Sequence, residues 1–274
     1  MPNGTDKPAF DVSVPSPARV WNYWVGGKDN YASDRAAAAQ ILAHVPTLPV
    51  GARLARKFLI GAVEYLITGH GIRQFLDIGS GLPTADNTHE VAQRAAPSSR
   101  IVYVDNDPIV ISHANALLTS TPEGRCDYIH GDLRDVDEIL ARAARTLDFT
   151  LPVAVIMLQV LHFIPDSDDP AGIIRRIMDQ LPSGSFLVIA QAPADMDPDG
   201  RRVTEQLAQR SGVAMRPRSQ EEVARFFDGL EILGPGVVSG LEWLELWSAA
   251  DGVDQIGVIP DGVNFGPNGI GRKP

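Results

Sequence analysis

The residues best suited to chemistry surround a short turn rich in glycine. Residues 75–84 run from an apolar segment through Asp77 into Gly79-Ser80-Gly81. Glycines in such a turn let the chain bend sharply and let a ligand approach the backbone without interference from Cβ atoms. Asp105 follows 28 residues after Asp77, at the end of the next predicted strand, where a carboxylate can accept hydrogen bonds from both hydroxyls of a ribose. The spacing predicts a ligand that contains a nucleoside, whereas the turn taken alone is also compatible with a tight connection that binds nothing.

Further polar residues follow the ends of the predicted strands. We expect Asp107 to cap a helix that starts at Pro108, which leaves Asp105 as the ribose ligand. Asp132 follows the third strand and can accept a hydrogen bond from an adenine amino group, or serve simply as a solvated loop acid. Thr84 is the predicted cap of the helix after the turn. The other candidate cofactor ligands near these strand ends are Ser80, Asn106, Leu133 and Gln159.

Two kinds of cofactor compete for this turn. A dinucleotide fold usually has a third glycine near position 84, where this chain has Thr84, and seats a pyrophosphate on the helix that follows. Thr84 therefore argues against NAD, and NAD-dependent oxidoreduction is our second hypothesis. A methionine sulfonium carries no phosphate, and Asp77 would lie near its amino group. The residues therefore favour S-adenosylmethionine as the cofactor.

Motifs that lie far apart in the chain strengthen this interpretation. They are Pro17-Ala18-Arg19-Val20, Gly26–Tyr31, Phe75–Thr84, Val104–Pro108 and Leu161–Pro165. Together they resemble a bacterial family of S-adenosyl methyltransferases that was once catalogued as a domain of unknown function. The resemblance implies an α/β fold of the class I methyltransferase type: a doubly wound, mainly parallel, seven-stranded sheet with an antiparallel last strand, an N-terminal helical cover, and S-adenosylmethionine at the carboxyl edge. The chain departs from the usual class I turn at Pro83, where another glycine is common.

Methyl transfer from a sulfonium mainly requires that the nucleophile and the methyl carbon be held in line and close together. His162 follows the fourth predicted strand and could take a proton from the acceptor; the alternative is a hydrogen-bonded core histidine. Tyr23 and Tyr31 belong to an N-terminal segment that we interpret as a lid, where they could bind or stack on the ligand, or only pack the cover. His162 and Tyr23 are thus the candidate catalytic residues. Arg19 is a candidate for binding the cofactor carboxylate, or an ordinary surface arginine.

The composition disfavours several functions. Lys and Arg total 24 against 34 Asp and Glu, and the net charge of −10 argues against a nucleic acid substrate. Cys126 is the only cysteine and the histidines are scattered, so we expect neither a disulfide nor a bound metal. We also expect no export signal, no membrane span and a cytoplasmic location. The acidity and the lid favour a small-molecule acceptor, and a non-catalytic protein that binds S-adenosylmethionine is the third hypothesis.

The chain is expected to form one globular unit, with a helical cover over residues 1–70 and a cofactor-binding core over residues 71–274. Five short apolar runs predict strands at Gln74–Ile78, Arg100–Val104, Cys126–His130, Val153–Leu158 and Ser185–Ala190. Helices are predicted from Ser33 to His44, from Gly51 to Thr68, and after the caps Asp107, Asp169 and Ser219. Beyond these, we predict strands near Leu230–Leu233 and Gln255–Ile259, and an irregular surface tail over Val263–Pro274.

Overall fold

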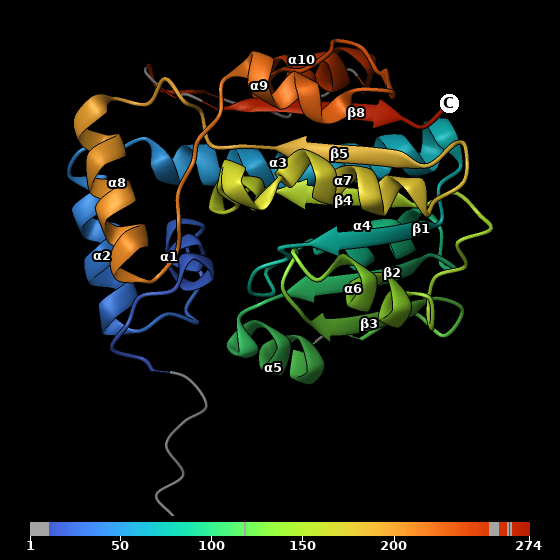
Figure 1. Cartoon of the computed structure of the whole chain (residues 1–274), viewed down its shortest axis with the longest axis horizontal. Coiled ribbons are helices and arrows are strands. Elements are labelled where there is room, and N and C mark those ends of the chain that lie inside the picture. Colours follow the sequence, from blue (N-terminus) through green and yellow to red (C-terminus); the bar gives the residue numbers. More distant parts are fainter. Residues whose placement is uncertain (1–10, 118, 252–257, 262, 264) are drawn as a thin grey trace, which may run out of the picture.

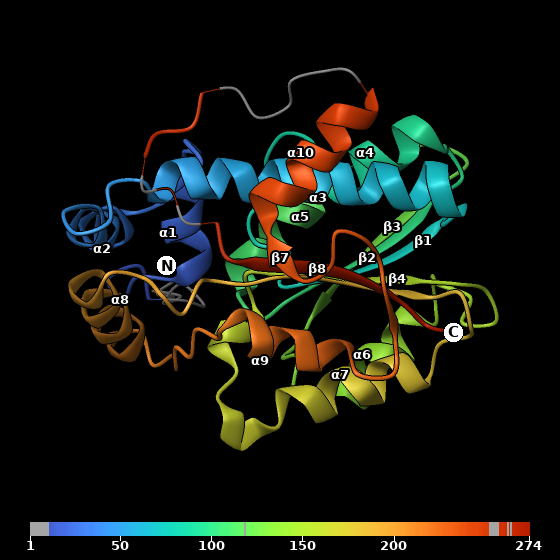
Figure 2. The ribbon, with the colours of Figure 1, turned by 90° about the horizontal axis from the view of Figure 1, so that it is seen from above.

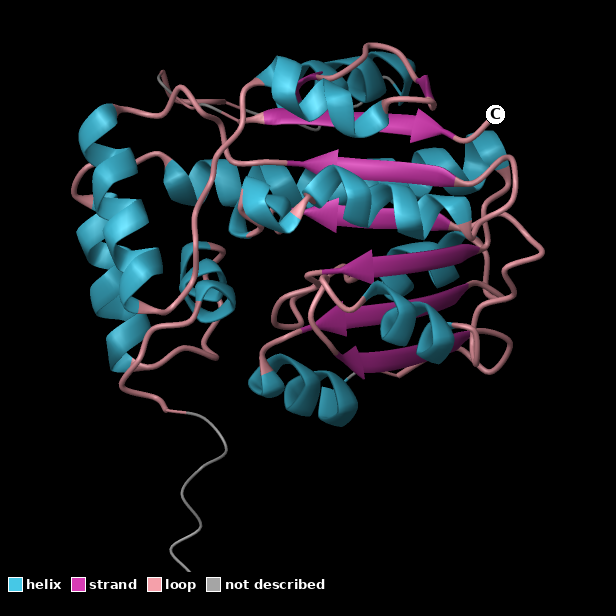
Figure 3. Cartoon of the chain, viewed as in Figure 1, coloured by secondary structure: helices cyan, strands magenta, loops and turns pink. Residues whose placement is uncertain are grey.

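A twisted, mixed β-sheet runs through the molecule and carries helices on both faces (Figures 1 and 3). The computed structural model describes residues 11–117, 119–251, 258–261, 263 and 265–274. The strands are β1 (Gln74–Ile78), β2 (Arg100–Asp105), β3 (Arg125–His130), β4 (Ala154–Leu158), β5 (Phe186–Ala190), β6 (Glu231–Ile232), β7 (Val238–Ser239) and β8 (Pro267–Arg272). Their order is β3-β2-β1-β4-β5-β8-β6, and β7 also pairs with β8.

The first five strands confirm the prediction, since each begins within one residue of its expected start and all five are parallel. Strand β8 runs antiparallel to β5, β6 and β7, as the resemblance implied. The sheet has eight strands where seven were expected, because β6 and β7, with two residues each, pair with different parts of β8. Strand β6 lies within the predicted Leu230–Leu233. The other predicted strand is not seen at Val258 and Ile259, and residues 255–257 lie outside the described residues.

The helices are α1 (Pro17–Trp24), α2 (Ala32–Leu42), α3 (Leu48–His70), α4 (Thr88–Ala95), α5 (Pro108–Leu117), α6 (Val136–Ala143), α7 (Pro170–Asp179), α8 (Pro198–Arg210), α9 (Gln220–Ala224) and α10 (Gly240–Asp251). Three short 3₁₀ turns are η1 (Leu161–Phe163), η2 (Asp166–Asp168) and η3 (Arg225–Phe227). The predicted caps are confirmed: the Asp107, Asp169 and Ser219 side chains each accept a backbone N–H at a helix start. The cap of helix α2 is Tyr31, two residues before the predicted cap Ser33, and the Ser33 hydroxyl instead donates to the Val12 carbonyl.

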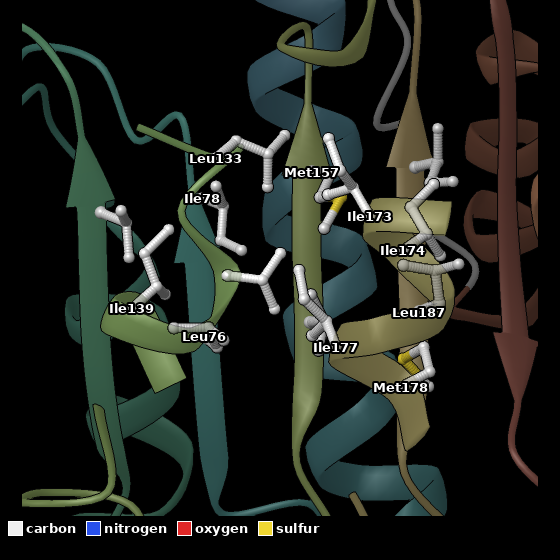
Figure 4. Packing of buried hydrophobic residues seen from close by; sticks show 14 of the residues in the cluster. Leu76, Ile78, Leu133, Ile139, Met157, Ile173, Ile174, Ile177, Met178 and Leu187 are labelled. Atoms are coloured by element: carbon white, nitrogen blue, oxygen red, sulfur yellow. The ribbon is translucent and has the colours of Figure 1, made fainter. Parts of the chain in front are cut away.

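Alternate residues of the buried strands face two separate hydrophobic clusters. Leu76 and Ile78 of β1 pack with α6 and α7 on one face, whereas Phe75 packs with α3, α4 and α10 on the other. Figure 2 shows these helix groups on opposite sides of the sheet, and Figure 4 shows the first cluster. These strands carry apolar residues along most of their length because both faces of the sheet are buried. Within the described residues, no helix is both long and apolar enough to span a membrane.

The prediction of an irregular surface tail over Val263–Pro274 is wrong. Residues 267–272 form β8, which lies between β5 and β6, and Ile270 is completely buried. The glycines that made this segment look like a loop serve close packing, because a Cβ atom on Gly269 or Gly271 would lie within 3.0 Å of the Phe227 ring. Phe227 therefore fills space that side chains would otherwise occupy on this strand.

Three helices form a layer beyond the carboxyl ends of the parallel strands, and we call α1, α2 and α8 the cover (Figure 1). Val20 of α1, Ala38 and Ile41 of α2, and Leu207 of α8 form its own small hydrophobic cluster. Most of α3 packs on the sheet instead, through residues such as Phe58 and Leu66. The cover thus combines the first part of the chain with a helix that follows β5.

Candidate functional site

The glycine turn after β1 is shaped by two residues that lie at positive φ. Gly79 has φ of 76°, and a Cβ atom there would lie 2.7 Å from Val160, so both the conformation and the space require glycine. Its N–H donates to the Val104 carbonyl at 2.8 Å, which joins the turn to the neighbouring strand β2. Gly81 has φ of 66° with open space where its Cβ atom would be. The turn therefore presents bare backbone at the carboxyl edge of the sheet, and Ser80 between the two glycines is partly exposed.

Asp105, at the end of β2, lies directly against this turn. Its Oδ2 accepts the Gly81 N–H at 2.8 Å and its Oδ1 accepts the Asp107 N–H at 2.9 Å. Each oxygen keeps a lone pair for a further donor. Burial raises the pKa of this carboxyl from 3.8 to about 6, opposed by the backbone hydrogen bonds from Asp107 and Gly81. The structure thus brings together the two features that the sequence paired.

A second acid and an arginine lie near the turn. Asp77 is 7% exposed and its Oδ2 accepts the Thr88 hydroxyl at 2.6 Å. Burial raises the pKa of Asp77 to about 6, while the Thr88 hydrogen bond and the attraction of Arg56 oppose that rise. Arg56 comes from α3, and its Nη2 donates to the carbonyls of Ala85 and Asp86. Sequence reasoning missed Arg56, because nothing local indicates that α3 passes beside the loop after β1.

The loop between the turn and α4 differs from the prediction. Thr84 does not cap the helix, which begins at Thr88 and follows Asn87. Thr84 instead donates its N–H to the Asn87 side chain at 3.0 Å. The Asn87 N–H donates to Glu90 Oε2 at 2.7 Å, a bond typical of a capping box. The loop is therefore three residues longer than expected, and the added residues include Ala85 and Asp86, whose carbonyls accept from Arg56.

A polar clasp, formed by Ser16, Arg19, Asp34 and Asp107, ties the cover to the end of β2. The Ser16 hydroxyl donates to Asp107 Oδ2 at 2.6 Å, and the Ser16 N–H donates to Asp34 Oδ1 at 2.9 Å. Arg19 Nε donates to Asp34 Oδ2 at 2.8 Å, its Nη2 donates to the Val14 carbonyl, and its Nη1 lies 3.7 Å from Asp107. Arg19 and Asp34 are 3% and 0% exposed. The buried Arg19 guanidinium is thus engaged within the protein, and its proposed contact with a cofactor carboxylate stays a prediction.

The remaining candidates near β2 and β3 have varied surroundings. Asn106 is exposed, whereas Leu133 is buried in the core cluster beside α6. The Asp132 carboxylate forms an ion pair at 2.9 Å with Arg134, which also binds Asp168 at 2.6 Å. A contact of Asp132 with an adenine amino group stays a prediction, and such a contact would have to share the carboxylate with Arg134.

Two buried polar side chains follow β4 and β5. His162 is 5% exposed, and its Nδ1 has no hydrogen-bond partner among the described residues. Burial, aided by the nearby charge of Arg218, lowers the pKa of His162 to about 3. Gln191 directly follows β5 and is completely buried, and neither atom of its amide has a partner within the described part of the chain. Gln159, whose N–H donates to the Ala190 carbonyl at 2.8 Å, joins the ends of the two strands.

Both predicted lid tyrosines lie in the cover and are 37% exposed. Tyr23 lies in the last turn of α1. Tyr31 directly precedes α2, its N–H donates to Asp34, and its ring lies 5.5 Å from the Arg19 guanidinium. Ala18 of α1 packs against a small hydrophobic cluster made of Leu82, which follows the glycine turn, and Ile109 and Val110 of α5. The cover therefore packs on the hydrophobic cluster that adjoins the turn.

Comparison with known proteins agrees with this geometry. A family model described as S-adenosyl methyltransferase matches residues 3–259. The chain belongs to the S-adenosyl methyltransferase family. S-adenosylmethionine is therefore the cofactor, which excludes the NAD-dependent oxidoreductase that the sequence alone left open. No curated protein matches the chain.

Two solved structures resemble this methyltransferase over nearly its whole length. A DUF574 family protein from Streptomyces avermitilis MA-4680 is 40% identical, with a TM-score of 0.86 over 96% of this chain and 99% of that one. A protein from Thermobifida fusca YX is 36% identical, with a TM-score of 0.83 over 97% of both chains. The plantazolicin methyltransferase BpumL, solved with S-adenosylhomocysteine (SAH), is 9% identical with a TM-score of 0.53 over 94% of this chain and 95% of that one. The last similarity shows the shared fold alone.

The residues at the carboxyl edge fit the family's cofactor. The glycine turn offers backbone that a ligand can approach closely, and Asp105 beside it can accept hydrogen bonds from a ribose. Asp77 and Arg56 supply one negative and one positive charge, which matches the zwitterionic amino acid end of S-adenosylmethionine.

Proposed function

We propose that this methyltransferase moves the methyl group of S-adenosylmethionine to a small-molecule acceptor by in-line displacement. The observation that carries the proposal is the hydrogen bond of 2.8 Å from the Gly81 N–H to Asp105, which joins the glycine turn to the carboxylate that would bind the ribose. Asp105 would accept the ribose hydroxyls, and Gly79, Ser80 and Gly81 would lie along the cofactor. The cofactor supplies an electrophilic methyl group on a sulfonium. A single cysteine suits the reducing cytoplasm in which we expect the reaction.

The cover would act as the lid of this site. The clasp holds α1 over the loop after β2, and Ala18 packs against the cluster that contains Leu82 beside the glycine turn. A closed cover would exclude water and leave room for a small acceptor rather than a polymer. Tyr23 and Tyr31, both partly exposed, would contact the ligands from this side.

The acceptor would bind beside the ends of β4 and β5. Gln159 lies there at a positive φ of 57° and would line the cofactor site. His162 has a pKa of about 3 and is neutral at physiological pH, so it can accept a hydrogen bond from an acceptor but is a weak base. Transfer would then depend on alignment, with His162 orienting the nucleophile.

Isothermal titration calorimetry with S-adenosylmethionine and NADH tests cofactor binding. We expect the wild type to bind S-adenosylmethionine with micromolar affinity and not to bind NADH. In Asp105→Asn the affinity for S-adenosylmethionine should fall at least about tenfold, because the two hydrogen bonds from the ribose hydroxyls lose their charged acceptor. Asp148→Asn is the matched control, because Asp148 is exposed in a loop and, within the described part of the chain, its carboxylate bonds only Thr150. Equal affinity in Asp105→Asn and the wild type would refute the assignment of the ribose ligand.

Turnover distinguishes the enzyme from a protein that only binds the cofactor. SAH release is measured with a panel of phenols, amines, thiols and carboxylic acids, alongside a basic peptide as the macromolecular alternative. Release with a small acceptor supports the proposal, and release with the peptide alone would contradict the small-molecule assignment.

A further inference from the structure

Arg56 places a cation beside the cofactor turn. It belongs to α3, which packs on the sheet, and its Nη2 donates to Ala85 O at 3.1 Å and to Asp86 O at 2.8 Å. These carbonyls belong to the loop between the glycine turn and α4. Arg56 Nε and Nη1 have no hydrogen-bond partner among the described residues, and the side chain is only partly buried. Three of its five N–H donors are therefore available to a ligand.

Asp77 supplies the opposite charge in the same neighbourhood, and the two groups attract each other. Opposite charges that share a low-dielectric environment usually form a direct ion pair. Here each group has other partners: Asp77 accepts from Thr88, and Arg56 donates to two carbonyls. No ion pair of 4.0 Å or less joins them within the described part of the chain. The arrangement leaves both charges able to bind the two ends of a zwitterion.

We propose that Arg56 binds the α-carboxylate of the cofactor's methionine portion, while Asp77 faces its ammonium group. This inference rests on the proposed binding of the cofactor at the glycine turn. Arginine suits the task because its planar guanidinium can donate two parallel hydrogen bonds to one carboxylate. Arg19, the arginine that the sequence analysis put forward, is 3% exposed and already bonded to Asp34 and Val14. Arg56 is thus the better placed of the two cations.

The test compares two ligands that differ at the amino acid end. SAH carries the carboxylate and the ammonium, whereas 5′-methylthioadenosine has the same nucleoside and a thioether but neither charge. In Arg56→Gln, calorimetry should show SAH affinity falling at least about tenfold, as expected for the loss of a charge-assisted pair, with 5′-methylthioadenosine affinity within about twofold of the wild type. Arg53→Gln is the matched control, because Arg53 is exposed on the same helix. It should change neither affinity.

If Arg56→Gln lowered the affinities for both ligands equally, Arg56 would only support the loop. If neither affinity changed, Arg56 would have no role in binding the cofactor. Either result overturns the inference. Arg56→Lys provides the same comparison if the glutamine variant does not fold, since it keeps the charge but loses the planar fork. Its SAH affinity should fall while its 5′-methylthioadenosine affinity holds. Wild-type protein that binds neither ligand would instead refute the proposed function, and with it this inference.

Discussion

Replacing Asp77 with asparagine should make the protein more stable while it impairs cofactor binding. Burial raises the pKa of this carboxyl from 3.8 to about 6, so the folded state holds the charged form less favourably than the unfolded chain does. At about 1.4 kcal/mol per pKa unit, the penalty approaches about 3 kcal/mol near pH 7. Asparagine removes the charge and can still accept the Thr88 hydroxyl. We expect the free energy of unfolding to rise by up to about 3 kcal/mol at pH 7.

The sign of the pH dependence makes this prediction specific. Because the folded pKa is raised, the penalty is fully present above about pH 6 and disappears as the pH falls below the unfolded value of 3.8. The advantage of Asp77→Asn should therefore shrink to about half between pH 7 and pH 5. Urea unfolding followed by circular dichroism at both pH values measures it.

Asp148→Asn provides a control of opposite sign. Hydrogen bonds from Thr150 lower the pKa of this exposed carboxyl, so its replacement should not stabilise the protein at pH 7. If Asp77→Asn were less stable than the wild type at pH 7, the charged carboxylate would be a net stabilising group. That result would refute the argument that burial raises the pKa of Asp77.

Three further predictions follow from other contacts. Gln191→Met should raise the free energy of unfolding in urea by about 1–3 kcal/mol, because it removes a buried amide that has no partner among the described residues; a loss of stability would indicate that the amide is satisfied. Ser16→Ala removes the hydrogen bond to Asp107, and stopped-flow fluorescence should show SAH dissociating about fivefold faster, corresponding to about 1 kcal/mol; an unchanged rate would argue against the lid. SAH affinity should weaken between pH 7.5 and pH 5, as Asp77 and Asp105, both with a pKa of about 6, become protonated; calorimetry showing constant affinity would contradict their roles.

The central sheet could be predicted because the signals for its first five strands are local. Each is a short apolar run, since burial on both faces leaves little room for polar residues. Because β1 and β2 are parallel, their carboxyl ends lie at the same edge of the sheet, and this brings the glycine turn close to Asp105. Helix starts marked by an acid before proline, as at Asp107 and Asp169, were equally predictable.

Features that depend on distant partners could not be predicted in this way. The glycines of β8 look like loop residues until Phe227, 44 residues before Gly271, is known to pack against them. The role of Arg56 depends on a loop about 30 residues further along the chain, and the contribution of α8 to the cover depends on apolar contacts with α2. The N-cap of α4 is the exception, because Asn87 and Glu90 have the local spacing of a capping box and could have been predicted from the sequence.

The position of β8 links maturation of the enzyme to the progress of its synthesis. Until residues 267–272 leave the ribosome, β5 has an unpaired edge, although the cover and the cofactor turn have long since been made. Lys273 then donates to the carbonyls of Met178 and Leu181, which fixes the new strand beside α7. A nascent chain halted before β8 would hold every proposed cofactor ligand and still expose a strand edge that favours aggregation. We therefore expect a chain that lacks β8 to be less stable and more prone to aggregate than one that contains it.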